Sequence, residues 1–187
     1  SVTMALMTNF LGIFKNKLGE KDSSLYFTMQ SIKINKKLNA KKALAYNYNS
    51  LGIHHYEKRT LDSCYYYFRK ALKIRTDLKL PNQSIEAYNN LGYVFLLEKL
   101  PDSAIVYFQK CIQLCLKYEK KSNLAVAYKN IADAYELTDN YRLALAAIKK
   151  SIPINDSLIG IKQKEQIISE QKQKNNELQI LQAYNKE

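Results

Sequence analysis

Asparagine residues recur at one spacing along this chain of 187 residues. Asn9, Asn49 and Asn89 are each followed by the next after 40 positions. A primary amide both donates and accepts hydrogen bonds, so such a column could pair with the backbone of an extended peptide. The same amides could instead join neighbouring structural units to one another. Both interpretations require an architecture that repeats with the spacing of these asparagines.

The residue types that support catalysis or metal binding are poorly arranged for either. His54 and His55 are adjacent, so on a helix they point in different directions, and we expect one to be packed and the other exposed. Cys64, Cys111 and Cys115 have no metal-ligand or redox spacing, and we expect all three to be buried. No Gly-rich phosphate loop, nucleophile elbow or His-Glu-x-x-His motif is present. The sequence therefore predicts a protein without an active site, a metal site or a cofactor.

Small and large residues follow the same period as the asparagines. An aliphatic residue followed by a small one recurs at Leu11-Gly12, Leu51-Gly52, Leu91-Gly92 and Ile131-Ala132. Further small residues follow at Ser24, Cys64, Ala104 and Ala144, and bulkier ones at Thr28, Phe68, Phe108 and Ile148. Several columns in one phase indicate an internal repeat, with copies at 1–40, 41–80, 81–120 and 121–154.

Each copy has the pattern of two helices joined by a short turn. One such hairpin cannot bury both of its apolar faces, so the hairpins must stack. We therefore expect an all-α fold, a right-handed α-solenoid of four helical hairpins. Asp22, Asp62 and Asp102 are expected to be the N-caps of second helices. The small residue after each aliphatic one, such as Gly52, is expected to permit close approach of the two helices of a hairpin.

Residues 155–187 form a separate region rich in Lys, Gln and Glu, which we expect to be one long C-terminal helix. Pro153 is expected to kink or end the helix before it. The first part of the tail should pack on the last hairpin as a cap. The remainder should project or pair two chains as a homodimer, in the manner of a coiled coil, through widely spaced apolar residues such as Ile161 and Ile168.

The repeat columns resemble the tetratricopeptide repeat (TPR) over residues 5–154. The resemblance is carried by Tyr48, Leu51-Gly52, Cys64, Phe68 and Ala71 in the second copy, and by the residues in phase with them in the third and fourth. The long tail after the repeats resembles the sensor regions of Bacteroidetes-type histidine kinases and helix-turn-helix regulators that contain such repeats. The resemblance implies an input region of a bacterial signalling protein that is anchored in a membrane beyond this segment. Its expected location is the periplasm, with the cytoplasm as the alternative.

In this family the first helix of each hairpin lines a concave face on which a protein or peptide partner binds. Transferring that role by phase gives candidate partner-binding residues in all four copies. They are Asn9, Ile13 and Asn16; Tyr46, Asn49, Ile53 and Tyr56; Glu86, Asn89, Tyr93 and Leu96; and Val126, Lys129, Asp133 and Glu136. Members of one helix are three or four residues apart, so they share one face. In the fourth copy Lys129 replaces the asparagine and could meet a carboxylate.

The formal net charge is +12, and the whole excess precedes residue 153. The basic residues concentrate late in the second helices and at the joins between hairpins. Among them are Lys33, Lys36, Lys37, Lys41 and Lys42; Arg69, Lys70, Lys73, Arg75 and Lys79; and Lys117, Lys120, Lys121, Lys149 and Lys150. A basic ridge could attract nucleic acid. No nucleic-acid motif accompanies it, so a solvated basic face is the favoured interpretation.

Overall fold

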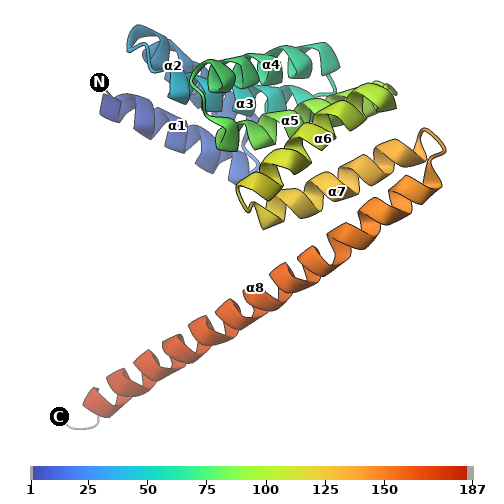
Figure 1. Cartoon of the computed structure of the whole chain (residues 1–187). Helices are drawn as coiled ribbons and strands as arrows, with labels where there is room; N and C mark the ends of the chain where they lie inside the picture. Colours follow the sequence, from blue (N-terminus) through green and yellow to red (C-terminus); the bar gives the residue numbers. More distant parts are fainter. Residues whose placement is uncertain (1, 185–187) are drawn as a thin grey trace.

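The computed structural model describes the backbone of residues 2–184 and the side chains within that range, apart from those of Val2, Leu6, Ile167 and residues 174–184. This part of the chain contains eight α-helices and no strand (Figure 1). The helices are α1 (Val2–Lys17), α2 (Lys21–Lys37), α3 (Lys41–Glu57), α4 (Leu61–Asp77), α5 (Pro81–Leu97), α6 (Pro101–Lys117), α7 (Lys121–Glu136) and α8 (Tyr141–Tyr184). Consecutive helices pair as hairpins, and the hairpins stack side by side, which confirms the predicted all-α solenoid.

The turns between helices show that the repeat period consists of two equal halves. Each turn contains one residue with a positive φ, and these residues, evenly spaced along the chain, are Gly19, Asn39, Arg59, Lys79, Lys99, Glu119 and Asp139. After α5 the Lys99 amide donates to the Leu96 carbonyl over 3.1 Å, and the Leu100 amide donates to the Phe95 carbonyl over 2.9 Å. This pair of bonds is a Schellman motif, which satisfies the last carbonyls of the helix. Equal turns make the helices from α2 onward start at equal intervals, each half a repeat after the previous one.

The N-cap prediction is wrong. Asp22, Asp62 and Asp102 each lie in the first turn as the second residue of a helix, and Glu20, Thr60 and Leu100 occupy the N-cap positions without a side-chain capping bond. The preceding Schellman turn takes three residues and fixes the start of the next helix earlier than an N-cap aspartate would need. The carboxylates still lie at the positive end of the helix dipole, where a negative charge is stabilising.

Close approach within a hairpin depends on glycine, as the sequence predicts. A Cβ atom placed on Gly92 would lie 2.6 Å from Cε1 of Phe108, a ring that is fully buried against α5. Gly52 and Phe68 repeat this contact one hairpin earlier. The ring therefore occupies the volume that any other residue at Gly52 or Gly92 would need for its Cβ.

The first helix lacks the cover that the later hairpins receive from their predecessors. Leu51, Leu91 and Ile131 are buried, whereas Leu11 in the same column is exposed. Met4, Met7 and Phe10 are exposed as well, and Phe10 has 69% of its surface accessible. Helix α1 thus has apolar residues at the positions that are buried in later repeats, although in the described structure several of them are exposed.

Helix α8 continues through Pro153, so of the two predicted outcomes, a kink or an end of the helix, the end is wrong. A proline removes one backbone donor, which leaves the carbonyl of Lys149 without its usual partner. Lys149 and Pro153 are both exposed, so water can hydrate that carbonyl. Ser151 is buried and Ile154 packs beside Cys115 and Leu124, after which α8 extends past the stack (Figure 1). None of the helices in the described range is both long and apolar enough to cross a membrane.

Candidate partner-binding groove

The first helices of the last three hairpins contribute to one hollow on the inner face of the stack. Ile53 and Tyr56 from α3, Tyr93 and Asn89 from α5, and Val126 from α7 line a volume of about 290 Å³. Five of the residues proposed from the sequence are therefore brought together from three helices. Ile53 and Val126 leave 37% and 48% of their surfaces exposed. An apolar surface held open in this way is available to a partner.

The remaining candidate residues are distributed along the same face. Asn16 and Ile13 line a hollow of about 170 Å³ beside Ile53, and Asn9 lines a third hollow on α1. Tyr46 and Glu86 line a hollow of about 230 Å³ between α3 and α5. The structure does not place the other candidates in any of these hollows, and they are Asn49, Leu96, Lys129, Asp133 and Glu136.

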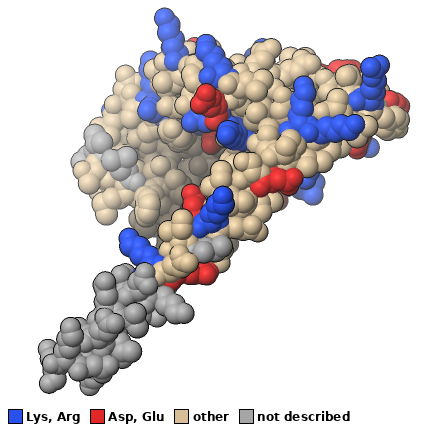
Figure 2. Space-filling model, turned by 60° about the horizontal axis from the view of Figure 1, so that its bottom comes forward, with Lys and Arg blue, Asp and Glu red and all other residues tan. Residues whose placement is uncertain are grey.

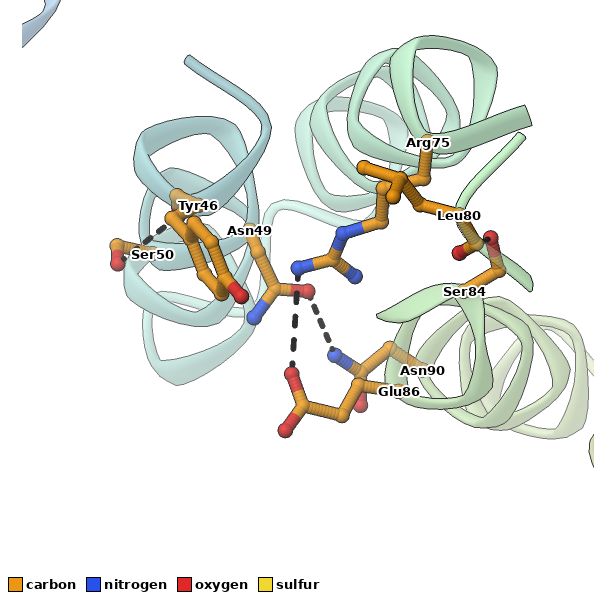
Figure 3. Close-up of polar contacts among 8 residues, drawn as sticks. All are labelled: Tyr46, Asn49, Ser50, Arg75, Leu80, Ser84, Glu86 and Asn90. Carbon is orange, nitrogen blue, oxygen red and sulfur yellow. Dashed lines mark hydrogen bonds and ion pairs between the residues drawn. The ribbon is translucent and has the colours of Figure 1, made fainter. Parts of the chain in front are cut away.

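The asparagine column joins neighbouring hairpins. Asn130 donates from Nδ2 to Asn89 Oδ1 over 3.0 Å, and Asn90 donates in the same way to Asn49 over 3.3 Å (Figure 3). We call the contact between two neighbouring hairpins a joint. At the first joint, between the α1–α2 and α3–α4 hairpins, the donor is Asn47, whose Nδ2 lies 3.0 Å from Asn9 Oδ1. Of the two interpretations of this column, the linking of hairpins is the one that the contacts show. The amide oxygens are thus engaged within the protein.

Two aromatic rings form the middle of the groove. The centroids of Tyr56 and Tyr93 are 5.8 Å apart, and the rings meet edge to face. The neighbouring Tyr93 side chain, and next burial, raise the pKa of Tyr56, so its hydroxyl group stays protonated. At the α7 end, burial raises the pKa of Asp133, while Lys129 opposes this effect.

One functional candidate was assigned to the wrong surface. Arg75 belongs to the predicted basic ridge, but only 1% of its side chain is exposed. Its guanidinium group reaches the inner face between α3 and α5, where Cζ lies 5.4 Å from the centre of the Tyr46 ring (Figure 3). The residues one repeat before and after it are Asn35 and Cys115, both buried. Because Asn35, Arg75 and Cys115 occupy equivalent positions in successive repeats, the cysteine in this set could have indicated that Arg75 lies at a buried position.

Several other basic residues have a structural role that follows the repeat. Lys70, Lys110 and Lys150 lie over the rings of Tyr48, Tyr88 and Tyr128, with Nζ 5.3, 5.9 and 5.6 Å from the ring centres. Such cation–π contacts stabilise the pairing of second helices with first helices. On the face that Figure 2 shows, Lys and Arg side chains are interspersed with acidic ones.

The histidines and cysteines serve packing. His54 is buried as expected for one of the pair, whereas His55 is half-buried and stacks on Tyr67 with ring centres 5.2 Å apart. Burial raises the pKa of Cys64 to about 11, which keeps this thiol protonated. Cys111 and Cys115 are also buried, as predicted. Among the described residues no group of His, Cys, Asp and Glu side chains has the arrangement of a metal site.

Comparison with known proteins agrees with this architecture. Residues 83–157 match the model of the tetratricopeptide repeat family. No curated protein sequence gives a significant match. The stack is a TPR-like α-solenoid, and solved structures of that fold superpose on most of it.

Three of these structures illustrate the likeness. The crystal structure of BtubC (BKLC) from P. vanneervenii has a TM-score of 0.75 at 18% identity, over 83% of this chain and 65% of that one. The TPR domain of Arabidopsis FLU has a TM-score of 0.60 at 21% identity, over 63% of this chain and 98% of the domain. The apo form of RapI has a TM-score of 0.74 at 14% identity, over 82% of this chain and 56% of its own. This chain thus spans about two thirds of BtubC and just over half of RapI.

Proposed function

We propose that this chain is a non-catalytic protein-binding module that holds a segment of a partner polypeptide on the inner face formed by α1, α3, α5 and α7. The observation that carries the proposal is the hollow of about 290 Å³ shared by α3, α5 and α7. Ile53, Tyr93 and Val126 give it an apolar lining that remains accessible. Burial of this surface by a partner supplies the driving force for binding.

Hydrogen-bonding groups beside the hollow suit a polypeptide. The oxygens of Asn49 and Asn89 accept from the next hairpin, but among the described residues their amide nitrogens have no acceptor. These nitrogens can donate to backbone carbonyl groups of a bound segment. An apolar groove with a few fixed polar groups is the usual composition of a recognition site. The asparagine column is therefore proposed to serve both the joints and the partner.

A pair of matched valine substitutions tests the groove. Peptides are selected from a displayed random library on the full chain, and their affinities are measured by fluorescence anisotropy. Val126→Glu places a charge in the hollow and should weaken binding by about tenfold or more, a loss of about 1.4 kcal/mol. Val106 on α6 is exposed to a similar extent, 50% against 48%, so Val106→Glu is the control and should bind normally. Undiminished binding to a folded Val126→Glu protein would overturn the assignment.

The finer proposal is that this module is the input region of a bacterial signal-transduction protein. Its support is the resemblance of the tail to such regions, together with the way α8 leaves the stack as one unbroken helix (Figure 1). A continuous helix can transmit a displacement from the groove to a following segment. The full-length reading frame tests this: a signal peptide upstream and a membrane span with an output domain downstream of Glu187 are expected, and a frame that encodes neither contradicts the proposal and the periplasmic location.

The second candidate function is association of two chains through α8. Ile161 and Ile168 are 47% and 64% exposed and seven residues apart, which places them on one stripe of the helix. Light scattering on the full chain should give a dimer mass that falls to the monomer mass in Ile161→Lys plus Ile168→Lys. Gln163→Lys plus Gln166→Lys, on exposed positions of the opposite side of the same helix, should leave the dimer intact. A monomeric parent chain would remove this candidate.

A further inference from the structure

Arg75 is a buried cation whose donors are unused. It extends from α4, the second helix of its hairpin, through the gap between α3 and α5 to the inner face (Figure 3). Its Nε, Nη1 and Nη2 atoms are all buried, and none has a hydrogen-bond partner among the residues that the structure describes. A guanidinium carries five N–H donors in a fixed planar array. Unused donors at a buried position are costly, so these donors favour the arrival of an acceptor group.

The nearest carboxylate does not supply that acceptor. Glu86 Oε2 lies 4.0 Å from Arg75 Nη2, which is an ion pair without a hydrogen bond, and the Glu86 side chain is 58% exposed. The Tyr46 ring covers the guanidinium from the other side. Burial lowers the pKa of Arg75, while Glu86 and Tyr46 oppose this effect. An arginine is nonetheless charged at every physiological pH, so the site holds a positive charge.

The repeat shows that Arg75 has no partner within the stack. At the first joint the equivalent residue, Asn35, donates over 2.9 Å to Oδ1 of the buried Asn47. One repeat after Asn47 the chain has Ala87, whose methyl group cannot accept a hydrogen bond. At the third joint Cys115 takes the place of Arg75 and needs no strong acceptor. Of these three joints, the second alone combines a strong donor with an apolar opposite position.

A hollow of about 230 Å³ lies beside Arg75, and a carboxylate that enters it reaches the buried guanidinium nitrogens once the exposed Glu86 side chain moves aside. Its lining is Tyr46, Arg75, Asn82, Gln83, Ile85, Glu86, Lys120 and Asn123. At roughly 30 Å³ each, it has room for about seven or eight water molecules, which is enough for one short side chain. Lys120 adds a second positive charge from beyond the next hairpin, against the one negative charge of Glu86. The hollow therefore has an excess of positive charge, while its amide side chains offer both donors and acceptors, among them the buried Oε1 of Gln83, which has no partner among the described residues.

We propose that Arg75 is the anion-recognition residue of the groove and binds the carboxylate of an Asp or Glu side chain of the partner in this hollow. The inference rests on the proposed protein-binding function and states which chemistry the partner must present. A carboxylate can accept two parallel hydrogen bonds from a guanidinium, which gives both direction and strength. Glu86 occupies the rim of the same hollow and competes with the incoming carboxylate.

The direct test uses the full chain and a fixed pair of probes. The protein is labelled with ¹⁵N, and the Nε–Hε signal of Arg75 is assigned by its loss in Arg75→Gln. The two probes are the blocked tripeptides acetyl-Gly-Glu-Gly-amide and acetyl-Gly-Gln-Gly-amide. The glutamate peptide should move the Arg75 signal in a saturable manner, and the glutamine peptide should not. A signal that neither peptide moves, or that both move equally, would overturn the proposal.

Glu86→Gln keeps the test independent of any folding defect in the Arg75 variant. Glu86 is largely exposed, so this change should leave the fold intact, and it removes the competing charge. Affinity for the glutamate peptide should rise roughly two- to fivefold, the range expected for one partly exposed charge. Unchanged or weaker binding of the glutamate peptide to Glu86→Gln would contradict the proposal that Glu86 and the partner carboxylate compete for Arg75.

The two proposals can fail separately. Library peptides that bind the wild-type chain, lose affinity in Val126→Glu and have no required acidic residue would overturn the role of Arg75 alone. Absence of any selected peptide, with a saturable response of Arg75 to the glutamate probe, would overturn the groove and leave the anion site standing.

Discussion

Asn130 donates from its amide nitrogen to Asn89 Oδ1 over 3.0 Å, which ties α7 to α5 across the joint between the third and fourth hairpins. Asn90 and Asn49 make the same bond one joint earlier. In both pairs the donor lies one position beyond a full repeat period from the acceptor. The bond therefore runs along the inner face from each first helix to the next and fixes the spacing of the groove walls.

Removing one of these amides should destabilise the stack. Asn130 is buried, so Asn130→Ala would leave the Asn89 oxygen without its donor, at a cost of about 1–2 kcal/mol in the free energy of unfolding. Urea denaturation followed by circular dichroism measures the loss. Gln113→Ala, at an exposed position of α6, is the control and should change stability very little. Equal free energies of unfolding for the two variants would show that the hydrogen bond between Asn130 and Asn89 makes no net contribution to stability.

The glycine beneath Phe108 should tolerate no side chain. Gly92→Ala brings a Cβ to within 2.6 Å of a fully buried ring, and overpacking of this kind costs about 1–3 kcal/mol. Gly160 in α8 has no atom within 4 Å of the same hypothetical Cβ. Gly160→Ala should therefore stabilise the helix by about 0.5–1 kcal/mol. Thermal unfolding of both variants checks the opposite signs, and a loss of stability in both would contradict the packing argument.

The turns offer a way to stabilise the protein. Lys99 has a φ of 59°, a conformation that is unfavourable for a residue with a Cβ. Lys99→Gly should raise the free energy of unfolding by about 0.5–1 kcal/mol, after the greater freedom of glycine in the unfolded chain is deducted. Gln109→Gly, in the exposed middle of α6, should instead lower it by about 1 kcal/mol. The midpoint of urea denaturation distinguishes these outcomes. A fall in stability for Lys99→Gly would mean that the lysine side chain itself stabilises the turn.

Acidification should destabilise the stack through His54. Burial, and then the charges of Lys58 and His55, lower the pKa of His54 below its ordinary value of 6.5, while Glu57 and Asp22 oppose this. The unfolded chain therefore takes up the proton first as the pH falls. The contribution to stability is complete above pH 6.5 and is lost as the pH falls below it.

The residue equivalent to His54 in the next repeat indicates which substitution removes the titrating group without disturbing the packing. Val94 is the buried residue one repeat later, so His54→Val should fold and should lose less stability than the parent chain when the pH falls from about 7.5 to about 5.5. Chemical denaturation at the two pH values measures the difference. Parallel losses in the two proteins would assign the pH dependence to other groups.

The regular parts of the fold were predictable because one period governs several independent columns. Gly52 faces Phe68 and Gly92 faces Phe108, as expected where the two helices of a hairpin must approach closely. The capping aspartates, and the end of the helix predicted as one outcome at Pro153, were wrong because both were judged from local preference. A Schellman turn fixed the helix starts, and an exposed carbonyl allowed a proline to remain within α8.

The sequence by itself determined the number of hairpins and their phase, because several columns share one strict repeat spacing, whereas the choice of the first helices as the inward-facing ones came from the family resemblance. Only the tertiary structure decided what the polar residues of that face do. It assigned the oxygens of Asn49 and Asn89 to the joints, and it turned Arg75 from an expected surface charge into a buried cation beside Glu86. The physical reason is that hydrogen bonding and burial depend on contacts between residues about one repeat apart or on adjacent helices, and a spacing pattern does not specify those contacts.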